Sequence, residues 1–95
     1  MTNSMHVTVK VFGGLRDRFQ GGSQDRELPP GSTLSDLMLD IETHYPDLSV
    51  KLVTGLAAGY LNVLINGRHS RFLQGQDTQL QDKDVIAFLP PVGGG

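Results

Sequence analysis

The chain contains no cysteine and no tryptophan among its 95 residues. Without cysteine it can form no disulfide, and it offers no thiolate as a nucleophile or metal ligand. Neither sign of charge dominates, because 8 Lys and Arg stand against 10 Asp and Glu, so a basic footprint for nucleic acid or anionic lipid is missing. No apolar run approaches the ~20 residues that span a bilayer. These absences favour one soluble cytoplasmic domain that binds neither nucleic acid nor membrane.

The residues that could carry catalysis or hold a metal form no recognisable site. No two of the three histidines, His6, His44 and His69, share a metal-ligand spacing such as H-x-x-x-H. Nothing resembles a nucleophile elbow, and neither pair of adjacent glycines in the first quarter of the chain begins a phosphate-binding motif. We therefore expect no metal, no bound cofactor and no enzymatic activity.

Two groups of charged side chains have ordinary explanations. Asp36, Asp40 and Glu42 lie off the apolar stripe of a predicted helix, where solvated charge is expected. The second group consists of Arg68, His69, Arg71 and Lys83. Two interpretations of it stay open, a small basic patch near the end of the chain and scattered solvated charges.

The first third of the chain carries β patterns. Polar and apolar residues alternate from His6 to Val11, which predicts a strand with one buried face. We expect residues 1–5 to be a flexible leader before it. Residues 24–28 are a weaker candidate for a second strand that pairs with the first.

A helix is predicted next. Ser32 or Thr33 is the expected N-cap, with Asp36 in a capping-box-like position. Apolar residues then recur at helical spacing in one stripe, which Pro46 ends; they are Leu34, Leu37, Met38, Ile41 and Tyr45.

The second half predicts a short helical turn and further strands. A short helical turn is suggested by Leu48, Leu52, Val53 and Leu56. Residues 61–65 are the most strand-like run. Asn66-Gly67 predicts a hairpin turn, after which residues 68–72 return as a short strand. Residues 85–89 close the sheet. The pattern defines an α+β domain over residues 6–89, with four to five strands and one main helix.

The last strand is apolar on both of its faces. Since a single helix covers only one face of a sheet, either Phe88 or Leu89 should face solvent, where an apolar side chain can bind a partner.

The stretch after this strand is the most informative one. Pro90 and Pro91 cannot continue the strand, because proline lacks the N–H that a ladder needs. Val92 and three glycines follow, and glycine has no Cβ and many accessible backbone conformations. We expect residues 90–95 to be a slim, flexible tail whose reactive group is the carboxylate of Gly95.

The stretch from Ala87 to Gly95, AFLPPVGGG, resembles the end of the MoaD/ThiS ubiquitin-like sulfur carriers, which commonly finish in F-[FL]-P-P-V-x-G-G. Gly94 and Gly95 match the terminal pair, and the resemblance covers residues 6–95. Upstream segments follow the family's order and spacing: Leu28-x-x-Gly31-Ser32-Thr33-Leu34, Asn66-Gly67-Arg68, Phe72-Leu73-x-Gly75, Asp77-Thr78-x-Leu80 and Asp82-x-Asp84-Val85.

The resemblance implies a ubiquitin-like β-grasp, with the first and last strands paired in parallel at the centre of a mixed sheet. It also implies that an adenylyltransferase of the ubiquitin-activating type consumes ATP to adenylate Gly95, which then becomes a thiocarboxylate that donates sulfur. Gly94 and Gly95 are then the reacting residues. The expected partner-binding residues are Phe88, Leu89, Pro90, Pro91, Val92 and Gly93.

The acceptor of the sulfur stays open. Pro90-Pro91-Val92 favours the molybdopterin branch of the family, in which the partner is the large subunit of molybdopterin synthase. The alternative is that the protein is also a sulfur carrier but delivers its sulfur to cysteine or thiazole synthesis. A protein modifier joined to lysines through Gly95 is a second hypothesis, and a β-grasp interaction module with an inert tail is a third.

Overall fold

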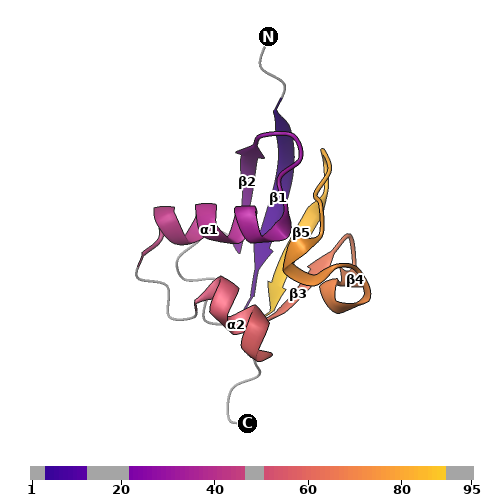
Figure 1. The fold of residues 1–95 in the computed structure, drawn as a ribbon. Helices are drawn as coiled ribbons and strands as arrows, with labels where there is room; N and C mark the ends of the chain where they lie inside the picture. The colour runs from indigo at the N-terminus through magenta and orange to yellow at the C-terminus, as the bar shows by residue number, and fades with distance from the viewer. Residues whose placement is uncertain (1–3, 13–21, 47–50, 90–95) are drawn as a thin grey trace.

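The computed structural model describes residues 4–12, 22–46 and 51–89. Within them, a five-stranded mixed sheet packs against two α-helices (Figure 1). In chain order the elements are β1 (Met5–Val11), β2 (Ser23–Leu28), α1 (Leu34–His44), α2 (Leu52–Ala58), β3 (Asn62–Ile65), β4 (Arg68–His69), the 3₁₀ helices η3 (Ser70–Phe72) and η4 (Gly75–Asp77), and β5 (Val85–Leu89).

The strand order is β2-β1-β5-β3-β4. β1 and β5 run parallel at the centre, with Thr8 opposite Val85 and Val11 opposite Phe88. All other neighbouring strands are antiparallel. This is the β-grasp arrangement that the resemblance implied, and the predicted α+β fold class is confirmed.

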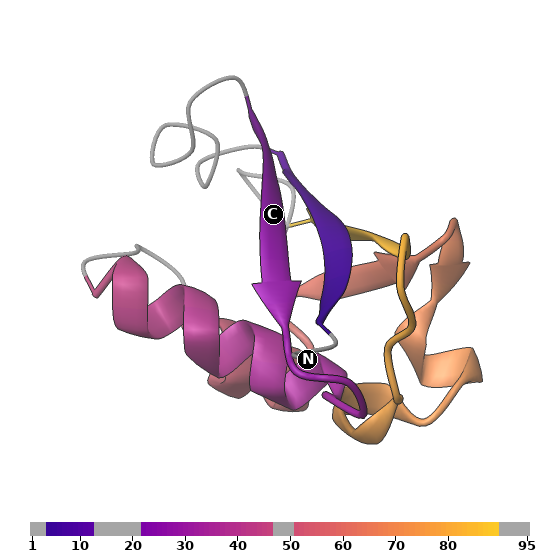
Figure 2. The same ribbon diagram turned by 90° about the horizontal axis from the view of Figure 1, so that it is seen from above.

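The hydrophobic core lies between the sheet and its helices. Figure 2 shows α1 lying across one face of the sheet. Alternate strand residues point to that face, as the period of two predicts for β1. The buried apolar side chains are Met5, Val7, Val9, Val11, Leu28, Leu34, Leu37, Met38, Ile41, Leu52, Leu61, Val63, Ile65, Leu80, Ile86 and Phe88.

Three strands start one residue away from the predicted position, and one of them is β2, which begins at Ser23. β1 begins at Met5, whose side chain is buried, so Met5 belongs to the folded domain and not to the expected leader of residues 1–5. Residues 1–3 lie outside the described residues, where the leader stays a prediction. β3 begins at Asn62, because Leu61 precedes the ladder although its side chain is buried in the core.

Helix α1 begins at a complete capping box. The Thr33 N–H donates to the Asp36 carboxylate at 2.9 Å, and the Asp36 N–H donates to Thr33 Oγ1 at 3.3 Å. These two bonds satisfy donors that the first turn of a helix leaves free. The helix ends at His44, with Tyr45 as its C-cap, and buries Leu34, Leu37, Met38 and Ile41 along one stripe.

The two remaining acidic residues of α1 are not simply solvated, contrary to expectation. Asp40 forms an ion pair with Arg26 on the helix-facing side of β2, and both side chains are largely buried. Glu42 accepts a hydrogen bond from the Val53 N–H at 3.0 Å. Each therefore ties α1 to another element.

Helix α2 is longer than the short turn that the sequence suggested. Its N-cap residue, Lys51, makes no side-chain cap, and the Glu42 carboxylate supplies an acceptor for the first turn instead. The helix ends at Gly59, whose φ of 85° lies in the left-handed region that glycine adopts without strain.

The β3–β4 turn matches its prediction, but β4 is shorter than expected. Asn66 and Gly67 have φ of 52° and 84°, as a two-residue hairpin turn with two positive φ angles requires. β4 then ends at His69, because His69 Nδ1 accepts the Arg71 N–H at 3.1 Å and caps the 3₁₀ helix η3.

Candidate functional site

The candidate site is centred on the end of β5. This strand has neighbours on both sides up to its last residues: Leu89 lies opposite Asn62 of β3, and Phe88 lies opposite both Val63 and Val11. The Phe88 carbonyl also accepts the Phe12 N–H at 3.3 Å. The backbone of β5 is therefore paired with β1 up to Phe88 and with β3 up to Leu89. Whatever follows Leu89 in the chain starts from a rigid base.

Phe88 and Leu89 lie on opposite faces of the sheet. Phe88 is completely buried, so its prediction as a direct partner-binding residue is corrected: its ring fills the core beneath the site. Leu89 is half-buried on the face that α1 does not cover. Of the two alternatives, Leu89 is the one that can contact a partner.

Leu89 belongs to a small apolar surface on this open face. Residues directly opposite one another in neighbouring strands share a face. Leu64 lies opposite Ala87, and Val85 and Leu89 alternate with the buried residues of β5. We call the half-buried residues Leu64, Val85, Ala87 and Leu89 the open-face patch.

Phe12 adds an aromatic ring at the same end of the sheet. It follows the last residue of β1 and is 45% exposed. Continuing the β1–β5 register by one position places it beside Leu89. The sequence prediction of the site did not include Phe12, although extending the alternation of His6 to Val11 by one residue already puts it on the open face.

The predicted tail lies outside the described residues. The roles of Gly94 and Gly95 as reacting residues, and of Pro90, Pro91, Val92 and Gly93 in partner binding, therefore stay predictions. The structure describes the strand that precedes them and the patch beside it.

The four basic residues do not form one cluster. His69 belongs to β4 and Arg71 to η3. His69 Nε2 is 3.0 Å from Oδ1 of Asn62, which lies in β3 opposite the last residue of β5. Lys83 lies in the turn before β5, where its N–H donates to the His6 carbonyl at 2.6 Å. It is thus at the N-terminal end of that strand.

Within the described ranges, no group of three His, Asp or Glu side chains is placed to hold a metal ion. In the same part of the chain, no helix has the length and apolar character needed to cross a membrane.

The fold and the site define a class, the ubiquitin-like β-grasp carriers and modifiers. The family model described as "ThiS family" matches residues 9–95. The chain belongs to the ThiS family.

Two relatives with named roles match almost the full length. One is small archaeal modifier protein 3 of Haloferax volcanii, 30% identical over 92 residues, with 96% of this chain and 100% of the relative covered. The other is the sulfur carrier protein CysO of Mycobacterium tuberculosis, 32% identical over 95 residues with the same coverage.

Solved structures confirm the fold. The chain is similar to the Haloferax volcanii protein HVO 2177, with a TM-score of 0.82, 30% identity, and 97% of this chain and 88% of that one covered. It is also similar to a putative molybdopterin converting factor subunit 1 of Pyrococcus furiosus, with a TM-score of 0.69, 26% identity, and 93% and 99% covered.

Proposed function

We propose that the protein is a sulfur carrier whose Gly95 carboxylate is adenylated and then converted to a thiocarboxylate. The observation that carries the proposal is the end of β5. A central strand, hydrogen-bonded on both sides, ends at Leu89 beside an apolar patch, and Pro-Pro-Val-Gly-Gly-Gly follows it directly. A rigid base presents a slim tether, while the patch gives a partner enzyme a surface to hold.

The chemistry is divided between two proteins. A carboxylate is a poor acyl donor, so its oxygen attacks the α-phosphorus of ATP, pyrophosphate leaves, and an acyl-adenylate forms. The outer sulfur of a persulfide donor then attacks the acyl carbon, and AMP leaves with the electron pair of the broken bond. A thiol next attacks the donor's inner sulfur, forms a disulfide with it, and releases the thiocarboxylate with the electron pair of the broken S–S bond. The activating enzyme supplies the catalytic groups, while this chain supplies the acyl group and its presentation. The protein is thus a co-substrate and not an enzyme.

The acceptor of the sulfur is a further part of the proposal. Pro90-Pro91-Val92 and the likeness to a molybdopterin converting factor subunit favour a molybdopterin synthase large subunit. The likeness to CysO favours an acceptor in cysteine synthesis as the second candidate. Both acceptors require the same thiocarboxylate, and both reactions belong in the cytoplasm.

Intact-mass spectrometry tests the shared step. The protein is incubated with the adenylyltransferase of its own organism, ATP and a sulfide donor. Its mass should rise by the difference between sulfur and oxygen, and a tail fragment should carry the change. An unchanged mass, with an activating enzyme that converts another carrier in parallel, would remove the main support for the proposal.

A protein modifier is the second candidate function, because one of the similar proteins is a small archaeal modifier protein. Conjugation would join Gly95 to a lysine through an isopeptide bond. A tagged chain expressed in its own organism and digested with trypsin would then leave residues 84–95, which follow the last basic residue Lys83, on lysines of other proteins. Their absence alongside a detected thiocarboxylate would favour the carrier alone.

A further inference from the structure

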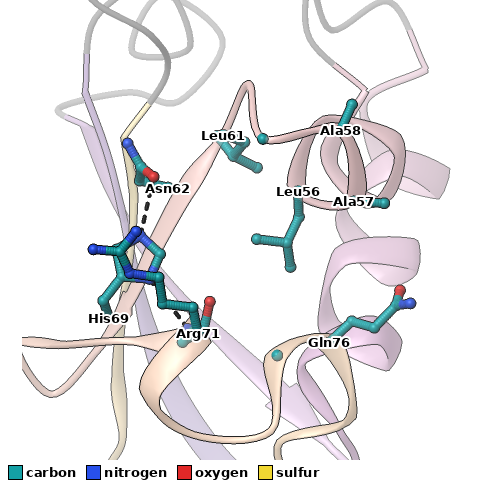
Figure 3. Close-up of a pocket in the computed structure, with 11 residues that line it drawn as sticks. Leu56, Ala57, Ala58, Leu61, Asn62, His69, Arg71 and Gln76 are labelled. Carbon is teal, nitrogen blue, oxygen red and sulfur yellow. Dashed lines mark hydrogen bonds between the residues drawn. The ribbon is translucent and has the colours of Figure 1, made fainter.

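A pocket of about 480 Å³ lies next to the end of β5. It is bordered by α2 and by the 3₁₀ helices η3 and η4 (Figure 3). Asn62, the register partner of Leu89, forms part of its wall. A protein that receives residues beyond Leu89 must therefore approach this pocket closely.

The pocket combines an apolar floor with a polar rim. Leu56, Ala57 and Leu61 supply apolar surface, and Figure 3 shows Leu56 extending from α2 toward the middle of the space. Asn62, His69 and Arg71 supply polar groups on the opposite side. An apolar floor with a few placed polar groups is the usual make-up of a binding pocket of this size.

Hydrogen bonds hold the polar rim in place. The Arg71 N–H donates to His69 Nδ1 at 3.1 Å, which leaves the ring proton on Nε2 to donate to Asn62 Oδ1 at 3.0 Å. The Arg71 guanidinium lies over the Phe72 ring, 5.0 Å from its centroid. The charge of Arg71 is thus positioned by its neighbours before any ligand arrives.

The charge of the pocket is unbalanced. Arg71 lines it, but no described lining residue is Asp or Glu, in a chain whose net charge is −2. Of the ion pairs formed within the described ranges, none includes Arg71. The guanidinium is therefore free to form a charge-assisted pair with a carboxylate brought by another molecule.

A buried hydroxyl in the wall adds a second observation. Ser70 is fully buried, and its Oγ has no hydrogen-bond partner among the described residues, although most buried hydroxyls have one. Ser70 also lines the pocket. The wall therefore holds a buried hydroxyl without a partner among the described residues, in the residue that precedes Arg71.

We propose that this pocket binds an apolar side chain and an adjacent carboxylate of the activating enzyme, as a second contact beside the open-face patch. The inference rests on the proposed function, because that enzyme is required whether the product is a sulfur carrier or a modifier. Two contacts on either side of Asn62 would fix the direction in which the chain beyond Leu89 enters the enzyme.

Binding of the full-length chain to the adenylyltransferase of its own organism tests the pocket by isothermal titration calorimetry. Arg71→Gln removes the charge on the rim, and Arg68→Gln removes an equal charge from the neighbouring β4, outside the pocket. We expect Arg71→Gln to weaken binding by about tenfold or more and to reduce its salt dependence. Arg68→Gln should stay within about twofold of wild type, as exposed single charges usually do.

A second pair of variants tests the apolar floor. Ala57→Trp fills the pocket from the exposed side of α2, and Leu39→Trp adds the same ring at an exposed position of α1. Only Ala57→Trp should weaken binding, with both melting temperatures close to wild type. Because it leaves Arg71 untouched, this pair decides the matter even if Arg71→Gln unfolds.

The two proposals fail in different ways. If wild-type protein supports ATP–pyrophosphate exchange but the Arg71 and Ala57 variants bind like their controls, the pocket is not a contact and only this inference is wrong. If wild-type protein neither binds the enzyme nor supports exchange, the proposed function fails, and the pocket inference falls with it.

Discussion

At the scale of single residues, the neighbours Phe88 and Leu89 have different tasks. The Phe88 side chain is fully buried in the core, whereas the Leu89 side chain is half-buried on the open face at the end of β5. One residue holds the base of the tail in the core, and the next is available to a partner. Their separation gives two predictions with opposite readouts.

Phe88→Ala should lower the free energy of unfolding by about 3 to 5 kcal/mol, because it removes a buried ring and leaves a cavity. Chemical denaturation with urea measures the change. Leu64→Ala, on the half-buried face of β3, is the control and should lose clearly less. Equal losses would mean that Phe88 packs no more tightly than a surface residue, which contradicts its place in the core.

Leu89→Asp should weaken binding of the activating enzyme by about 1 to 3 kcal/mol if Leu89 is an anchor at the centre of the interface. The melting temperature should change little, since the side chain is half-buried on the uncovered face. Phe12→Asp, at the same end of the sheet, should behave similarly. A large loss of stability with unchanged binding would instead place Leu89 in the core.

The sequence alone could not choose between Phe88 and Leu89. Residues 85–89 are all apolar, so alternation, which identified the inward face of β1, gives no face for β5. The choice is made by the register with β1 and β3, which depends on contacts distant in sequence. Phe12 was predictable by the same alternation, and the prediction stopped one residue too early.

At the scale of elements, local signals predicted α1 well and α2 poorly. The capping box of Thr33 and Asp36 and the apolar stripe are both contained in the helix's own sequence. α2 instead takes its first-turn acceptor from Glu42, 11 residues upstream in α1. η3 likewise depends on the His69 ring turning back to the Arg71 N–H. Such side-chain bonds are not visible in a periodic pattern.

Glu42→Ala tests the dependence of α2 on α1. Loss of the carboxylate leaves the Val53 N–H without its acceptor, and we expect a loss of about 0.5 to 2 kcal/mol in the free energy of unfolding, as for other helix caps. Glu27→Ala is the control, since its pairing with His6 is exposed and should contribute little. Equal effects would show that Glu42 acts only through its charge.

At the scale of the whole molecule, the fold places the first and the last strand of the domain side by side. β1 and β5 are parallel neighbours at the centre, so the last strand is braced on both sides where a reacting tail would leave it. Pattern reasoning predicted an α+β domain, and only the family resemblance predicted the parallel pair. A parallel pair joins distant segments, and no local signal in the chain specifies it.

The central claim is that Gly95 reacts at the end of a slim tether beyond a folded domain, and ATP–pyrophosphate exchange with the cognate activating enzyme tests it most directly. Deleting Gly95 shortens the reach by up to ~3.6 Å, and Gly94→Val adds bulk where the enzyme must admit the chain. A misplacement of about 1 Å can cost on the order of a hundredfold in rate. Both variants should therefore melt like wild type and lose exchange. Exchange at the wild-type rate from either variant would mean that Gly95 is not the reacting residue, and would contradict the account.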